Sequence, residues 1–138
     1  MSEEIQNFNQ GIIEEFRANH GKVGGMFEGR DLLLLTTVGA KSGQERISPL
    51  AYQRDGARMV VIASYGGADK HPAWYHNILA NPKVTVDLGD GAFPAAAVVH
   101  AEGPERDRLY ARMAEAMPQF AEYQQKTERI IPVVVLEK

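Results

Sequence analysis

The chain of 138 residues has no cysteine, which excludes disulfide bonds, thiolate metal sites and cysteine nucleophiles. It has no apolar run near the roughly 20 residues that cross a bilayer. Excess positive charge is also absent, because the formal net charge is −3, and this disfavours a general nucleic-acid-binding surface. The acidic start, Met1–Glu4, lacks the basic and apolar segments of a signal peptide. We therefore expect a soluble, cytoplasmic protein that binds no nucleic acid.

Several catalytic motifs are missing as well. No His-Glu-x-x-His pair occurs, and His71 and His76 are five residues apart, which puts them on different faces of a helix. We therefore predict no metal site. The Gly-x-Ser-x-Gly turn of many hydrolases, the Walker loop and the dinucleotide glycine pattern are also absent. These absences favour a reaction in which a bound cofactor supplies the reactivity.

What the sequence contains is a series of short apolar segments separated by glycine and proline. We predict about six strands, at 32–38, 46–54, 59–64, 84–88, 93–101 and 131–136. We expect helices at about 2–18, from Pro72 to Asn81, and over 104–117 and 120–128. Strands and helices do not alternate as a parallel sheet requires. The sequence therefore predicts one domain over residues 1–138, mainly β with helices (α+β), built as an antiparallel barrel.

The expected first helix is amphipathic. Ile5, Phe8, Ile12 and Phe16 recur at helical spacing, and glutamates occupy the opposite face. Helices that lie on membranes usually have basic polar faces. Packing against the protein's own domain is therefore favoured, with peripheral membrane contact as the alternative.

Two glycine-containing loops follow strand-like runs. The first carries Lys41 and Arg46 on either side of Gly43, so backbone N–H groups and two cations could bind an anion there. The second, Ser64–Gly67, leads into a helix whose first N–H groups favour phosphate. A solvated hairpin and a plain strand-to-helix turn are the alternatives. Together the loops predict a site for an anionic cofactor.

Trp74 and Asn77 lie three apart on the helix that follows the second loop. A lone tryptophan is more often a core residue than a shelf for a cofactor. A buried amide needs hydrogen-bond partners, so an asparagine on the same face favours the edge of a pocket.

These segments resemble the deazaflavin-dependent nitroreductase family of actinobacteria. The resemblance is strongest over residues 32–46 (LLLLTTVGAKSGQER), 63–82 (ASYGGADKHPAWYHNILANP) and 131–136 (IPVVVL), and it runs from about Phe8 to the C-terminus. It implies a split β-barrel related to the oxidoreductases that bind flavin mononucleotide (FMN). It also implies coenzyme F420, an 8-hydroxy-5-deazaflavin with a phosphodiester and an oligoglutamate tail, as the cofactor.

The activity that the resemblance implies is hydride transfer from reduced F420 to a quinone, such as menaquinone, or to a nitro-type acceptor such as a nitroaromatic. The alternatives are an FMN-dependent oxidoreductase on the same fold and a non-catalytic module that binds the deazaflavin or a lipid. By this resemblance Ser64 and Tyr123 lie on the substrate side, as candidates to donate a hydrogen bond or a proton. The residues that the resemblance places around the cofactor are Lys41, Ser42, Gly43, Arg46, Pro49, Leu50, Ala63, Ser64, Tyr65, Gly66, Gly67, Ala73, Trp74, Tyr75 and Asn77.

Two positions depart from the family pattern. Family members often carry lysine where this chain has Tyr65, which predicts that one contact to the tail is lost or replaced. A nitroreductase of the family has tyrosine where this chain has Phe120. The resemblance therefore supports quinone reduction more strongly than reduction of nitroimidazole prodrugs.

Overall fold

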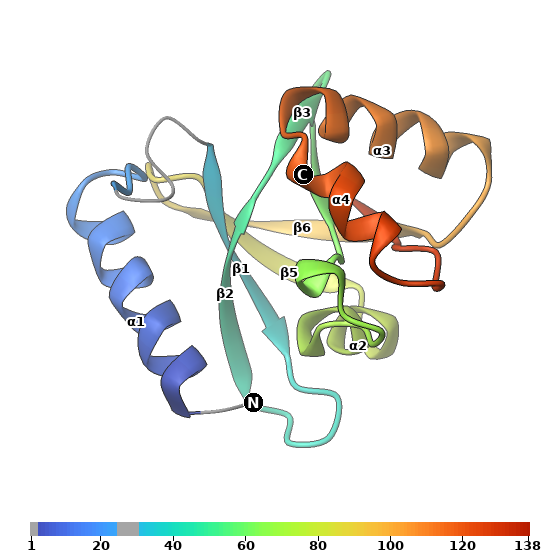
Figure 1. The fold of residues 1–138 in the computed structure, drawn as a ribbon. Helices are drawn as coiled ribbons and strands as arrows, with labels where there is room; N and C mark the ends of the chain where they lie inside the picture. Colours follow the sequence, from blue (N-terminus) through green and yellow to red (C-terminus); the bar gives the residue numbers. More distant parts are fainter. Residues whose placement is uncertain (1–2, 25–30) are drawn as a thin grey trace.

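The computed structural model describes residues 3–24 and 31–138; side chains before Asn9 and the exposure of Gly66 lie outside this description. Figure 1 shows helices set around a strongly curled sheet. The strands are β1 (Leu32–Val38), β2 (Glu45–Ala51), β3 (Gln53–Asp55), β4 (Arg58–Ile62), β5 (Lys83–Asp87), β6 (Ala92–His100) and β7 (Val133–Glu137). The helices are α1 (Glu3–Ala18), the 3-10 turn η2 (Tyr65–Gly67), α2 (Ala73–Ala80), α3 (Pro104–Ala116) and α4 (Gln119–Gln125).

All strand pairs are antiparallel, and the order across the sheet is β2-β1-β5-β6-β7-β4-β3. The two ends of this order, β2 and β3, are consecutive in the chain and separated only by Tyr52. One bent segment therefore belongs to both edges and curls the sheet toward a barrel (Figure 1). The predicted fold, a mainly β split barrel with helices, is confirmed.

The predicted count of six strands is wrong, because the described residues form seven. The segment expected as one strand at 46–54 changes partner at Tyr52. The backbone N–H of Tyr52 still donates to the Asp31 carbonyl beside β1, at 3.2 Å. The next residue, Gln53, already pairs with Val60 of β4. Alternation of side chains along a strand does not reveal a change of partner, so the sequence pattern showed a single strand.

The run of four leucines in β1 is buried on both faces. Leu33 and Leu35 point into the barrel interior, while Leu32 and Leu34 pack with Ile12 and Phe16 of α1 on the outside. A strand covered on both sides loses the usual alternation of apolar and polar residues. The described part of α1 therefore packs on its own domain; the side chains of Ile5 and Phe8 lie outside the described residues. No helix in the described ranges has the length and hydrophobicity that membrane crossing requires.

A second outer layer covers β4 and β7. Val60 and Val135 turn outward beneath α3 and α4, where they meet Leu109, Met113 and Phe120. Figure 1 shows these two helices on one side of the sheet, away from α1. The two helical layers leave the region between β2 and α2 for the site.

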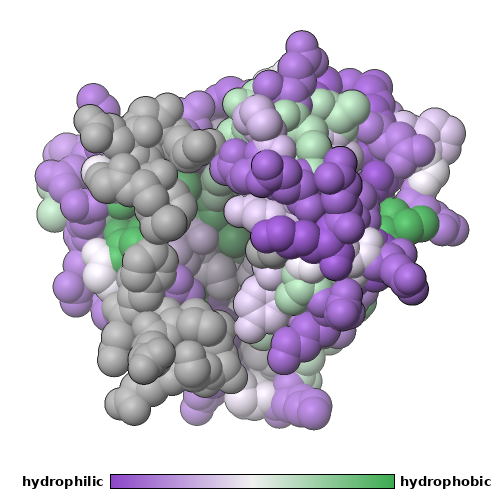
Figure 2. All heavy atoms as spheres, in the orientation of Figure 1, coloured by the Kyte–Doolittle hydropathy of each residue, from purple (hydrophilic) through white to green (hydrophobic). Residues whose placement is uncertain are grey.

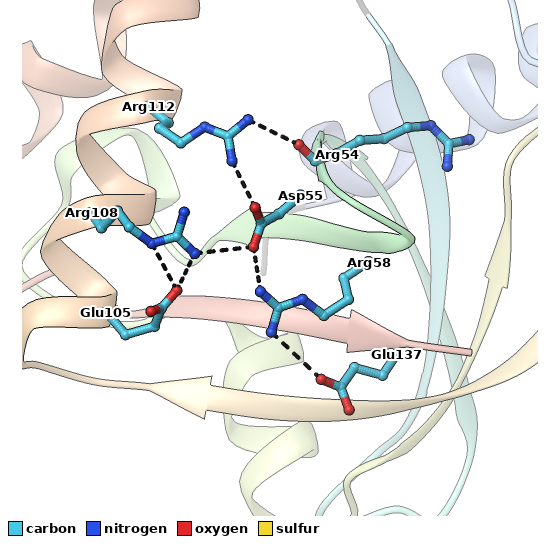
Figure 3. A network of polar contacts seen from close by, with 7 residues as sticks. All are labelled: Arg54, Asp55, Arg58, Glu105, Arg108, Arg112 and Glu137. Atoms are coloured by element: carbon cyan, nitrogen blue, oxygen red, sulfur yellow. Dashed lines mark hydrogen bonds and ion pairs between the residues drawn. The ribbon is translucent and has the colours of Figure 1, made fainter.

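A charge network ties the turn between β3 and β4 to α3 (Figure 3). Asp55 accepts hydrogen bonds from Arg112 at 2.7 Å, from Arg108 at 3.1 Å and from Arg58. The hydrogen bonds from Arg108 and Arg58 lower the pKa of Asp55 to about 2. Arg58 also lies 3.7 Å from Glu137 on β7. The network thus joins β3, β4, α3 and β7, and none of its residues lines the cavity described below.

Candidate functional site

A cavity of about 560 Å³ opens between β2, the loop after β4 and the start of α2. Figure 2 shows hydrophobic atoms in a hollow on this side of the molecule, with polar residues along its right rim. The predicted site residues that line it are Pro49, Leu50, Ser64, Tyr65, Ala73 and Trp74. The lining also includes Asn9 of α1, Ser48, Ile62, Lys70, His71, Pro72 and His76. The structure thus joins the second loop, the middle of β2 and the start of α2 in one concave surface.

The cationic loop lies beside the cavity and not within its lining. It is the tight turn between β1 and β2, closed by hydrogen bonds from Gly39 N–H to the Gln44 carbonyl at 2.7 Å and from Gly43 N–H to the Gly39 carbonyl at 2.9 Å. The side chains of Lys41, Ser42 and Arg46 are exposed. Gly43 has a φ of 71°, a conformation that favours glycine.

The alternation of β2 links this turn to the cavity. Arg46, Ser48 and Leu50 are two residues apart and so share one face of the strand. Ser48 and Leu50 line the cavity, and Arg46 therefore extends the same face by roughly 7 Å. The described residues show no ion pair between Arg46 and a carboxylate, which leaves its guanidinium available to an anion at this end.

Asn77 does not line the cavity. Its side chain is buried, its Oδ1 accepts a hydrogen bond from the Ala40 N–H at 2.9 Å, and its Nδ2 donates to the Thr37 hydroxyl at 3.1 Å. Helix α2 is thereby fastened to the cationic turn. The buried amide has hydrogen-bond partners, as we expected of a buried asparagine. These partners belong to β1 and the turn after it and do not lie at the edge of the cavity.

The second loop is held in a strained conformation. Tyr65 has a φ of 48°, which is uncommon for a bulky residue, and it is partly exposed at the cavity. Gly67 has a φ of 85°, and a Cβ there would lie 2.9 Å from the carbonyl oxygen of Tyr123. Such strain persists only where surrounding contacts maintain it. Helix α4 supplies one of these contacts, because it packs directly against the loop.

Three other predicted site residues lie behind the cavity surface. Ala63 is fully buried and donates its N–H to the Pro132 carbonyl at 3.0 Å. Tyr75 is buried and packs its ring 4.7 Å from that of His71, and burial raises its pKa. Tyr123 packs edge-on against Phe120 at 5.4 Å, below α3. None of the three belongs to the cavity lining.

Arg129, a residue that no sequence motif pointed to, holds the second loop from behind. Its guanidinium donates to the carbonyls of Ser64 and Ala68, both at 2.8 Å, and of Ala63 at 3.3 Å. It also lies 3.2 Å from Nδ1 of His71. Burial lowers the pKa of Arg129. These contacts join a segment just before β7 to residues some sixty positions earlier, so only the tertiary structure could reveal them.

Ser64 is the buried polar residue of the lining. Its carbonyl is taken by Arg129, while its hydroxyl makes no hydrogen bond within the described residues. The hydroxyl is therefore free to bind a molecule in the cavity.

A metal site has no comparable support, because no group of three or more His, Asp or Glu residues in the described ranges could hold an ion.

A comparison with protein families matches residues 11–138 to the F420H2-dependent quinone reductases. The chain belongs to this family. A protein of Mycobacterium tuberculosis named F420H2-dependent quinone reductase is 39% identical over 126 residues, which cover 89% of this chain and 85% of the relative. Family membership makes the chain an oxidoreductase whose cofactor is coenzyme F420.

Solved structures agree on the fold. The structure of an F420H2-dependent reductase, FDR-A, has a TM-score of 0.71 and 45% identity, and the match covers 78% of this chain and 95% of that one. A candidate pyridoxamine 5'-phosphate oxidase from Listeria innocua has a TM-score of 0.55 at 12% identity, over 94% of this chain and 91% of its own. The second likeness concerns the fold alone.

The residues at the cavity suit F420. A volume of about 560 Å³ lies within the range of pockets that hold ring systems of drug size. Leu50, Ile62 and Trp74 supply apolar wall, and the Ser64 hydroxyl supplies a free polar group. Outside the cavity, the exposed Arg46 continues the same face of β2, and its guanidinium is of the type that binds carboxylates and phosphates.

Proposed function

We propose that the chain reduces a quinone at the cavity between β2 and α2, with the deazaflavin ring in the cavity and the acidic tail along the turn that carries Lys41 and Arg46. The observation that carries this proposal is the continuity of one β2 face, from Arg46 outside to Ser48 and Leu50 inside. An apolar slot with cations at one end matches a flat ring with an anionic tail. We extend the proposal to one deazaflavin-binding domain over residues 1–138.

The protein's part in the reaction is to bind and orient. Bound F420H2 supplies a hydride. Pro49, Leu50, Ala73 and Trp74 form walls that exclude water and hold a planar ring. The Ser64 hydroxyl is placed to hydrogen-bond a carbonyl or to hand a proton to the reduced acceptor. Tyr123 lies behind Gly67 and outside the cavity lining. We therefore propose that it supports the second loop. Its catalytic role stays a prediction, which the variant Tyr123→Phe tests.

The acceptor we propose is a quinone of the menaquinone type, with nitroaromatics as further substrates. A lipid quinone requires the protein to approach a membrane surface. Co-sedimentation with liposomes, with and without menaquinone, tests that contact. Phe120 lies in the apolar cluster under α3 and α4 and outside the cavity lining. Its difference from the family nitroreductase is therefore expected to act on the cavity only through α4.

The decisive experiment mixes the protein anaerobically with F420H2 and menadione. Oxidation of F420H2 at a rate proportional to enzyme supports the proposal. Parallel titrations with F420 and FMN separate the two cofactors. Tight FMN binding with no response to F420 would overturn the proposal, and F420 binding with no oxidation by any quinone or nitro compound would favour the non-catalytic binding module.

A further inference from the structure

Arg129 and His71 form a polar pair that the proposed function leaves unused. The Arg129 Nη1 lies 3.2 Å from the His71 Nδ1. A guanidinium is always charged and has only donors, so it must donate and Nδ1 must accept. The same imidazole nitrogen cannot then carry a proton. If the ring is neutral, its proton resides on Nε2.

The surroundings of His71 keep the ring neutral. Burial lowers the pKa of His71, and electrostatic interactions with Arg129 and His76 lower it further. The ring also packs 4.7 Å from Tyr75, whose own pKa burial raises, so that phenol stays uncharged. Burial lowers the pKa of Arg129, and the neighbouring acid Asp69 only partly offsets that effect. Burial and the interactions with Arg129 and His76 therefore disfavour an imidazolium.

The remaining ring nitrogen is available. His71 lines the cavity together with Ser64 and Trp74, and its Nε2 makes no hydrogen bond within the described residues. The N–H of a half-buried ring on the wall of a cavity needs a partner from the molecule that enters. Water serves when the cavity is open, and a ligand atom must replace it when a ring fills the space.

We propose that His71 is a ligand-binding residue whose Nε2–H donates a hydrogen bond to a carbonyl oxygen of the molecule in this cavity, and that Arg129 is the positioning residue that fixes this tautomer. The ligand's identity rests on the proposed function, whereas the tautomer does not. Both a deazaflavin ring and a quinone carry carbonyl oxygens, so the two sources share one chemistry.

The tautomer is tested first, without any ligand. Protein labelled with ¹⁵N at histidine gives long-range ¹H–¹⁵N correlations that distinguish Nδ1–H, Nε2–H and imidazolium rings. Variants of His20, His71, His76 and His100 to Phe assign the signals. We expect His71 as the neutral Nε2–H form at pH 7, titrating below 6.5. An Nδ1–H ring, or an imidazolium at pH 7, would overturn the proposal whatever the protein catalyses.

The partner of the N–H is tested by binding. His71→Phe keeps an aromatic ring against Tyr75 and removes the donor, and His100→Phe, at the end of β6, is the matched control. We expect His71→Phe to raise Kd about five- to tenfold, the equivalent of one neutral hydrogen bond. If the cofactor accepts the hydrogen bond, the Kd for F420 should rise when no quinone is present. If the quinone accepts it, only the Kd for menadione should rise. Unchanged Kd for both ligands refutes a binding role.

The role of Arg129 is read from the same spectra. In Arg129→Lys, the fork that reaches three carbonyls and Nδ1 is lost while the charge is retained. We expect the Nδ1–H tautomer to become detectable and the Kd to rise. In Arg129→Met, the loss of charge should also raise the pKa of His71. A pure Nε2–H ring and unchanged pKa in Arg129→Met would show that Arg129 does not position His71. If F420 does not bind the wild-type protein at all, the proposed function fails while these spectra still judge the tautomer.

Discussion

Asn77→Ala tests how the cationic turn is fastened to α2. In the native structure the amide satisfies the Ala40 N–H and the Thr37 hydroxyl at once. Ala40 is exposed, so water can replace the lost acceptor. Thr37 is only 1% exposed, so its hydroxyl loses a partner that water cannot supply, at a cost of about 1–3 kcal/mol. Alanine returns roughly 0.5 kcal/mol through its higher helix propensity.

The net destabilisation expected for Asn77→Ala is therefore about 1.5 kcal/mol. At roughly 2 cal/mol/K of unfolding entropy per residue, a chain of this length should lose about 5 °C in Tm. Urea unfolding of wild type, Asn77→Ala, Thr37→Val and the double variant completes a thermodynamic cycle. Because the two side chains bond each other, the double variant should lose about 1 kcal/mol less than the sum of the single variants.

The same variant separates the two halves of the cofactor site. A loosened turn must be reordered when it binds the tail, at about 1 kcal/mol, so Kd for F420 should rise about fivefold. In the proposed binding mode only the tail contacts the turn, so a deazaflavin without phosphate and glutamates should bind equally well to both proteins. A loss of stability below 0.5 kcal/mol, or an equal loss of affinity for both ligands, would refute the link between Asn77 and the turn.

Three further predictions concern single side chains. Arg46→Ala should weaken F420 binding by about 1–3 kcal/mol, the worth of a charge-assisted contact, while Lys83→Ala, which removes an exposed charge on β5, should leave Kd unchanged in the same fluorescence titration. Gly67→Ala should destabilise the fold by about 1–3 kcal/mol, because the φ of Gly67 is 85° and a Cβ there would meet the Tyr123 carbonyl. Gly11 lies in α1 with open space around it, so Gly11→Ala should stabilise the fold by roughly 0.5–1 kcal/mol in the same denaturation assay. Asp55→Asn should flatten the acid limb of the stability curve: the lowered pKa of Asp55 means that its contribution is complete above the ordinary value of 3.8 and is lost as pH falls toward 2. A wild-type acid limb equal to that of Asp55→Asn would rule this out.

Local features of the sequence were sufficient for most of the fold. The predicted strand at 32–38 coincides with β1, and the helix from Pro72 to Asn81 contains α2, because proline and glycine mark element ends by their own backbone restrictions. The partner change at Tyr52 was missed, since it depends on β4 folding back beside β3. The short η2 was missed because its left-handed Tyr65 is maintained by distant contacts and not by local preference.

The candidate site, like the fold, was predicted only in part from the sequence. Lys41, Arg46, Ser64 and Trp74 could be picked out because anion binding and pocket walls need recognisable residue types at recognisable turns. The structure assembled Ser64, Tyr65 and Trp74 with Pro49 and Leu50 in one cavity. The cofactor contacts assigned to these residues stay predictions.

By itself, the sequence determined the class of fold, the two glycine-containing loops and the family, since each depends on residue type and spacing along the chain. Only the tertiary structure decided which of these residues share a cavity. It set Asn77 under the cationic turn and not at the pocket edge, and it brought Arg129 behind Ser64 and beside His71. Contacts of this kind join residues tens of positions apart, and their partners are chosen by packing geometry that no local pattern encodes.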